Sequence, residues 1–240
     1  MRTTILPSML EIVARNYSYR NKSARLYELG KIYLPREDGL ADEPKYLSLS
    51  AYGDGVDFFA FKGGIETLLR ELRIADVKFE ACTDNASYHP GRCANVYAGE
   101  KLLGVFGQIH PLVAANYGVD TEVYTAELSF EAMYEMRGGI PVYQPLPKFP
   151  AVTRDIAVVC DEGVTVGALE ESIRCGAKGL LKDVSLFDIY RGPGVAIGKK
   201  SVAFSLVLRA DDRSLTGEEA DEDVQSILAA LKADHNAVLR

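Results

Sequence analysis

A set of basic and aromatic side chains in the second half of the chain has the chemistry needed to hold RNA. Lysine and arginine neutralise phosphates, and a tyrosine ring can stack on an unpaired base. In the structural alternative the tyrosine closes a sheet edge and the lysines are solvated, and the residue types alone leave both interpretations open. The candidate RNA-binding residues are Lys148, Arg154, Tyr190, Arg191, Lys199, Lys200, Arg209 and Arg213.

The other polar residues give little support to catalysis or metal binding. The set closest to a metal site is Cys82, His89, Cys93 and His110. Their spacings of seven, four and seventeen positions fit no standard zinc site. No Gly-x-Ser-x-Gly elbow accompanies the three histidines, and the glycines at 192 and 194 precede no helical pattern that could cradle phosphate. We therefore predict no catalytic residue, no metal site and no cofactor in this chain.

The chain is acidic, with 27 Lys and Arg against 34 Asp and Glu and a formal net charge of −7. Residues 143–240 hold 12 basic and 15 acidic side chains, so the part that carries the candidate residues is acidic too. This excludes a uniformly basic nucleic-acid binder. Any contact with RNA must depend on a local cluster of cations.

Composition also indicates the cellular compartment of the protein. Hydrophobic residues make up 48% of the chain, which predicts packed cores, and no apolar run approaches the 18 residues of a membrane span. The first residues lack the apolar segment of a signal peptide. The cysteines form no Cys-x-x-Cys pair and are expected to be free thiols, and we predict a cytoplasmic protein without membrane contact.

The candidate residues lie within a strand–helix–strand–strand–helix–strand pattern. Thr165 is the expected N-cap of the first helix, and residues 216–219 form a capping box that opens the second. This order predicts a ferredoxin-like βαββαβ domain over residues 147–240, with helices on one sheet face and the other face open. The predicted strands are 152–159, 184–190, 201–209 and 237–239, and the first predicted helix is 166–175.

Strand alternation assigns the candidate side chains to faces of this sheet. Tyr190 and Arg209 are predicted to point outward, and Phe187 inward. The first and third strands should be central, so Arg154 and Arg209 are expected to be neighbours. The lysine pair 199–200 is expected to border a loop, where substitution would leave folding intact.

The first part of the chain predicts an antiparallel sheet with helices beside it, so the fold class is α+β. A Gly-Gly-Ile-Pro run begins a predicted linker over residues 138–146, which divides the chain into domains 1–137 and 147–240. The predicted strands are 24–34, 46–52, 77–82, 93–98, 101–109 and 123–130, and the predicted helices are 7–17, 111–116 and one within 58–74.

Eight separated motifs resemble those of bacterial phenylalanyl-tRNA synthetase beta subunits, in order and over nearly the whole chain. In the second domain they are residues 147–157, 187–192 (FDIYRG), 198–201 (GKKS) and 213–216 (RSLT). In the first they are residues 1–7 (MRTTILP), 25–30 (RLYELG), 89–92 (HPGR) and 104–111 (GVFGQIHP).

The resemblance implies that residues 1–137 form a truncated class II synthetase-like module without catalysis, and that residues 147–240 bind an anticodon stem-loop. Active modules of this kind carry an arginine near their end, whereas residues 123–130 contain Glu127 and no arginine. The resemblance further implies a C-terminal piece of a longer chain. Its partners would be phenylalanine tRNA and an alpha subunit, in an alpha2-beta2 heterotetramer whose alpha subunit performs the catalysis with ATP and magnesium.

A second hypothesis comes from a different class of protein. Regulatory domains of the same ferredoxin-like topology sense small molecules, so the chain could join an amino-acid sensor to a structural α+β module. Titration with tRNA against titration with free amino acids separates the two hypotheses.

Overall fold

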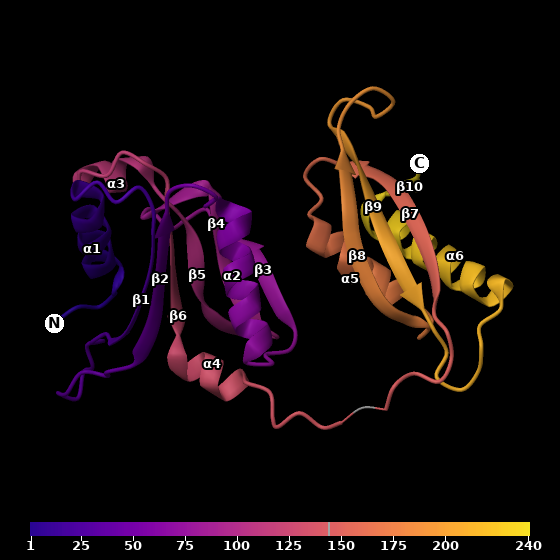
Figure 1. Ribbon diagram of the computed structural model, residues 1–240, viewed down its shortest axis with the longest axis horizontal. Helices are drawn as coiled ribbons and strands as arrows, with labels where there is room; N and C mark the ends of the chain where they lie inside the picture. The colour runs from indigo at the N-terminus through magenta and orange to yellow at the C-terminus, as the bar shows by residue number, and fades with distance from the viewer. Residues whose placement is uncertain (144) are drawn as a thin grey trace. The chain divides into compact units, whose positions relative to one another are not determined.

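The computed structural model describes residues 1–143 and 145–240, and it divides into two compact units, Met1–Pro141 and Val142–Arg240 (Figure 1). Gln144, which belongs to the predicted linker, lies outside the described residues. Among the described residues, no helix has both the length and the apolar character needed to cross a membrane.

The first unit is built on a six-stranded antiparallel sheet in the order β1-β2-β6-β5-β4-β3. The hairpin of β4 and β5 turns at Gly99, whose φ of 57° lies in the left-handed region that glycine adopts without strain. The strands are β1 (Ala24–Lys31), β2 (Lys45–Tyr52), β3 (Val77–Ala81), β4 (Tyr88–Ala98), β5 (Lys101–Ile109) and β6 (Val123–Ser129). The predicted antiparallel α+β pattern is confirmed.

Helices cover both faces of this sheet. On one face, α2 (Phe58–Glu71) begins at Asp57, whose side chain accepts a hydrogen bond from the Ala60 amide at 2.7 Å, and α2 buries an apolar stripe against Phe106. On the other, α1 (Leu6–Ser18) contributes to a second apolar cluster with the short helix α3 (Pro111–Asn116). The packing of helices on both faces holds in position the strands that carry the polar residues described below.

Two features of the first unit differ from the sequence prediction. A helix α4 (Phe130–Met136) follows β6, and the sequence prediction missed it because it assigned the N-cap Ser129 and Phe130 to the strand 123–130. In addition, β4 begins at Tyr88, before the predicted strand 93–98, so the His-Pro-Gly-Arg segment at 89–92 lies inside an irregular strand. Pro90 removes a ladder donor there, which explains the shift in register.

The second unit confirms the ferredoxin-like prediction. Its four antiparallel strands lie in the order β10-β7-β9-β8, with the first and third strands of the unit at the centre. The helices α5 (Val166–Gly176) and α6 (Gly217–His235) pack on one face of the sheet, where they bury the side chains of Ile156, Phe204 and Leu206 (Figure 1). The strands are β7 (Val152–Asp161), β8 (Leu181–Tyr190), β9 (Lys199–Leu208) and β10 (Val238–Leu239).

The edge strand β8 carries a bulge that overturns one predicted orientation. Leu186 pairs with Phe204 and Asp188 with Ala203, so Phe187 has no partner in the ladder. Its side chain is 58% exposed, although alternation predicts that it points inward. A bulge inserts an extra residue and re-aims the side chains around it.

Candidate nucleic-acid interface

Tyr190 lies at the end of β8, and its ring is held from two sides. Its hydroxyl donates a hydrogen bond to the carbonyl of Pro193 at 3.2 Å, within the loop that joins β8 to β9. The Arg240 guanidinium lies over the ring, 4.9 Å from its centroid. Ser201, which pairs with Tyr190 in the ladder, alternates with core residues of β9, so this pair belongs to the sheet face that the helices leave open.

Two candidate cations beside the same loop form ion pairs. Lys199 lies opposite Asp161 in the ladder, and its Nζ atom is 2.8 Å from the carboxylate. Arg191 donates two hydrogen bonds to one Glu162 oxygen, at 2.7 and 2.9 Å, and these bonds lower the pKa of Glu162 below its ordinary value. Exposed pairs of this kind contribute little to stability because solvent screens the charges. A phosphate could therefore replace either carboxylate at little cost.

Lys200 does not border the loop, and the predicted position was wrong. Its side chain is only 6% exposed, and its Nζ donates a hydrogen bond to the Glu162 carbonyl at 2.9 Å. It pairs with Cys160, a fully buried residue on the helix-covered face. A long alkyl chain can be buried in this way while its ammonium reaches a carbonyl near the surface.

Substitution of the two lysines should therefore have unequal effects on folding. We expect Lys200→Ala to lower the unfolding free energy of the second unit by about 1–3 kcal/mol, because it leaves the Glu162 carbonyl unpaired. Lys199→Ala should cost less than about 1 kcal/mol, since it removes an exposed ion pair. Thermal unfolding of the two single variants tests this, with Lys200→Met as the control that keeps the buried alkyl chain. Equal melting temperatures for Lys200→Ala and Lys199→Ala would contradict it.

Arg154 and Arg209 are not neighbours on one face, which corrects a second prediction. Arg154 lies two residues before the buried Ile156 and so on the same face of β7, and its Nε is 2.9 Å from Asp221 of α6, which places it on the helix side. Arg209 directly follows β9 on the other side, and its amide donates to the Leu180 carbonyl. Its Nε is buried and has no hydrogen-bond partner among the described residues. The structure therefore separates these two candidates.

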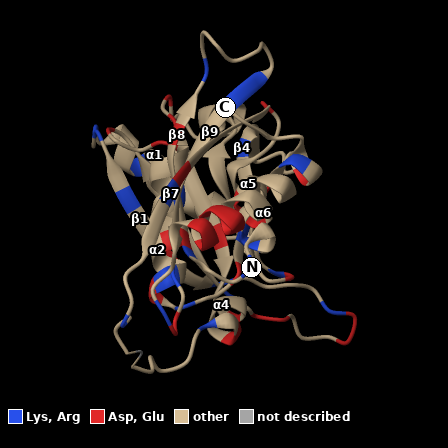
Figure 2. Ribbon diagram, turned by 90° about the vertical axis from the view of Figure 1, so that its right-hand side faces the viewer, with Lys and Arg blue, Asp and Glu red and all other residues tan. Residues whose placement is uncertain are grey.

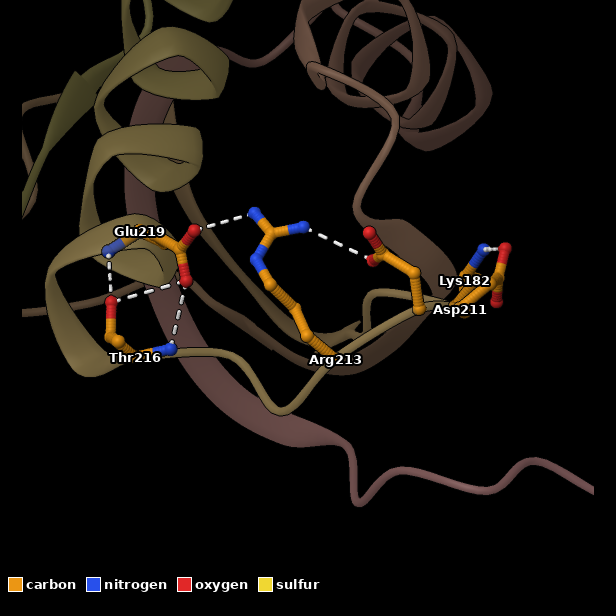
Figure 3. Close-up of polar contacts among 6 residues, drawn as sticks. Lys182, Asp211, Arg213, Thr216 and Glu219 are labelled. Atoms are coloured by element: carbon orange, nitrogen blue, oxygen red, sulfur yellow. Dashed lines mark hydrogen bonds and ion pairs between the residues drawn. The ribbon is translucent and has the colours of Figure 1, made fainter.

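Arg213 belongs to the capped start of α6 (Figure 3). It binds Asp212 at 3.1 Å and Glu219 at 2.5 Å, and Glu219 in turn accepts hydrogen bonds from the amide and hydroxyl of Thr216. The Thr216 backbone, followed by Arg213, lowers the pKa of Glu219 to about 2. The capping box predicted from the sequence is confirmed, and it engages Arg213.

This pKa gives a pH dependence of known sign. Glu219 is stabilised in its charged form, so its contribution is present above its ordinary pKa of 4.5 and is lost as the pH falls from there toward 2. We expect Glu219→Gln to lower the melting temperature of the second unit at about pH 7. The variant should also show a smaller decrease in melting temperature as the pH falls from about 4.5 to 2.5. Glu222→Gln, on the exposed side of the same helix, is the control. An acid transition identical to that of the unsubstituted chain would contradict this role for Glu219.

Acidic residues concentrate on α6 (Figure 2). This helix packs on the sheet face opposite to Tyr190. Glu218, Asp221 and Glu222 line a shallow hollow there together with Lys178. Such a surface repels phosphates, which leaves the open face and its loop as the electrostatically acceptable side for RNA. Lys148 is exposed ahead of β7.

In the first unit, the carboxylate of Glu127 lies in the stretch 123–130, which has an acid and no arginine. One oxygen of Glu127 accepts hydrogen bonds from the Thr4 hydroxyl at 2.6 Å, the Ile5 amide at 2.7 Å and the Leu6 amide at 3.1 Å. The carboxylate thus binds the start of α1, where it also complements the helix dipole. Among the described residues, no three His, Cys, Asp or Glu side chains gather where they could hold a metal ion.

Arg240 is the residue that sequence reasoning missed. Its contact with Tyr190 depends on the pairing of β10 beside β7, and no local sequence pattern predicts this contact. The basic final residue was the only signal in the sequence.

Comparisons with known proteins agree with this architecture. The model of a family described as phenylalanyl tRNA synthetase beta chain CLM domain matches residues 1–130, and that of the ferredoxin-fold anticodon binding domain matches residues 147–240. The second match and the strand order place the last part of the chain in the class of ferredoxin-fold anticodon-binding domains. The chain belongs to the phenylalanyl-tRNA synthetase beta chain family.

Curated relatives support this assignment along the whole chain. Phenylalanine–tRNA ligase beta subunits of Clostridium tetani and Bacillus subtilis are 40% and 35% identical, each over 100% of this chain. That of Symbiobacterium thermophilum is 40% identical over 97% of it. The chain spans only 27–31% of the length of these relatives.

Proposed function

We propose that this chain serves a phenylalanine–tRNA ligase as a non-catalytic part, in which the second unit binds the anticodon stem-loop of phenylalanine tRNA. The observation that carries the proposal is the open sheet face of the second unit. Tyr190 and Arg240 meet there, and α6 holds a block of acids on the opposite face. The names of the relatives, which are all beta subunits of this ligase, support the choice of RNA.

Catalysis belongs elsewhere in this proposal. Amino-acid activation requires cations that neutralise the phosphates of ATP, and the residues of this chain do not fit that need. In the stretch where active modules carry an arginine, Glu127 contributes a negative charge, and its carboxylate already binds the start of α1. ATP and magnesium would act in a partner alpha subunit of an alpha2-beta2 enzyme in the cytoplasm.

The alternative of an amino-acid sensor is tested in the same titration. We expect a labelled anticodon stem-loop of phenylalanine tRNA to bind the chain with an affinity that falls as salt rises, and free amino acids to leave its signal unchanged. Phenylalanine-dependent ATP–pyrophosphate exchange by the chain alone should equal a blank without enzyme. Binding of an amino acid without RNA binding would favour the sensor, and exchange above the blank would contradict the non-catalytic role.

A further inference from the structure

We propose that Arg240, whose guanidinium lies over the ring of Tyr190, is the residue through which the second unit holds a phosphate of single-stranded RNA. This inference rests on the proposed function and names the chemistry of its site. It adds a residue that the motifs of the chain do not indicate.

The first argument is that Arg240 differs from the three candidate cations beside the loop between β8 and β9. Lys199 is paired with Asp161, Arg191 with Glu162, and Lys200 is buried. Arg240 has no carboxylate partner among the described residues, and its guanidinium contacts the ring of Tyr190. A phosphate can therefore bind it without displacing an acid.

The second argument is that the side chain is held in place at both ends. The Arg240 amide donates a hydrogen bond to the Ala157 carbonyl of β7 at 2.9 Å, next to the pairing of Leu239 with Val158. Tyr190 belongs to β8, the edge strand on the other side of the sheet, so the arginine side chain reaches across β7 and β9 to it. The ring that receives it is fixed by the bond to Pro193.

The third argument concerns the chemistry of a guanidinium that lies over a ring. The Arg240 guanidinium lies over the ring of Tyr190, and a planar guanidinium that turns its face to a ring keeps its N–H donors available in its own plane. Two of them can bind two phosphate oxygens side by side, which a lysine ammonium cannot do. Tyr190 thus acts as a positioning residue that orients the guanidinium.

The test compares three variants of the full chain, using a fluorescein-labelled anticodon stem-loop of phenylalanine tRNA between about 50 and 200 mM KCl. We expect Arg240→Gln to weaken binding about tenfold and to reduce the log–log salt slope by about 0.7, the value for one phosphate contact. Arg240→Lys should retain the slope but lose affinity. Lys232→Ala removes an exposed cation from α6 and should change neither quantity.

Tyr190→Leu provides the second line of evidence, because it keeps Arg240 and removes the ring. It should weaken binding, and the double variant with Arg240→Gln should bind no more weakly than Arg240→Gln alone. Unchanged affinity and slope in a folded Arg240→Gln chain, or fully additive losses in the double variant, would overturn the inference while leaving RNA binding intact. Failure of the unsubstituted chain to bind the stem-loop would overturn the proposed function itself, and this inference with it.

Discussion

Glu127→Ala is expected to lower the unfolding free energy of the first unit by about 3 kcal/mol or more. The substitution removes the acceptor of three hydrogen bonds, from the Thr4 hydroxyl and the amides of Ile5 and Leu6. Bonds to a charged group contribute about 1.5–3 kcal/mol each, and two amides of the first turn of α1 would lose this acceptor. Such a loss is a large fraction of the 5–15 kcal/mol typical of whole domains.

Hydrogen exchange followed by mass spectrometry measures this effect locally, without assuming that the two units unfold together. Peptides from α1 should exchange much faster in Glu127→Ala, and those from α5 and α6 should not change. Glu127→Gln keeps an acceptor oxygen without the charge and should be intermediate. Glu135→Ala, which removes an exposed ion pair with Lys101, is the matched control. Protection of α1 equal to that of the control would show that Glu127 does not hold the helix.

Under the proposed function, replacing Tyr27 and Leu29 together by aspartate is expected to disrupt assembly with an alpha subunit. These side chains are 78% and 50% exposed on the edge strand β1, opposite the partly buried Leu49 and Leu47. An apolar strip on a free sheet edge is a typical site for a partner. Loss of two apolar contacts at such a site should reduce the binding free energy by about 4 kcal/mol, or raise Kd roughly 1000-fold.

Sizing chromatography with the alpha subunit of a relative's enzyme tests this expectation. The unsubstituted chain should co-elute with that subunit, and the double aspartate variant should not. Leu112→Asp, at an exposed position of α3, should co-elute normally. Co-elution of the double variant at micromolar concentration would place the subunit contact elsewhere on the chain.

Much of the fold could be predicted because the chain contains strong local sequence signals for helices and strands. The 3.6-residue apolar spacing of α5 and α6 and the capping box at Thr216 predicted both helices of the second unit, and four β-branched runs predicted its strands. Their order was then sufficient for the ferredoxin-like topology, since few arrangements satisfy a βαββαβ sequence.

The orientation of single side chains was harder to predict. Alternation assumes an uninterrupted ladder, so the bulge in β8 invalidated the prediction for Phe187. Lys200 was misplaced because residue type indicates a solvated charge, whereas its alkyl chain is buried beside Cys160. The contact of Arg240 with Tyr190 depends on how the strands pair across the sheet, and residue spacing along the chain does not predict such a contact. The helix α4 was missed because its N-cap, Ser129, was assigned to the strand that precedes it.

The central claim is that RNA meets the open sheet face of the second unit and not its acidic helix face. Ultraviolet cross-linking of the chain to a phenylalanine tRNA anticodon stem-loop, followed by mass spectrometric mapping, tests it directly. The account predicts cross-linked peptides from residues 186–201 and from the segment that ends at Arg240. Cross-links confined to α5 and the acidic turns of α6 would contradict it.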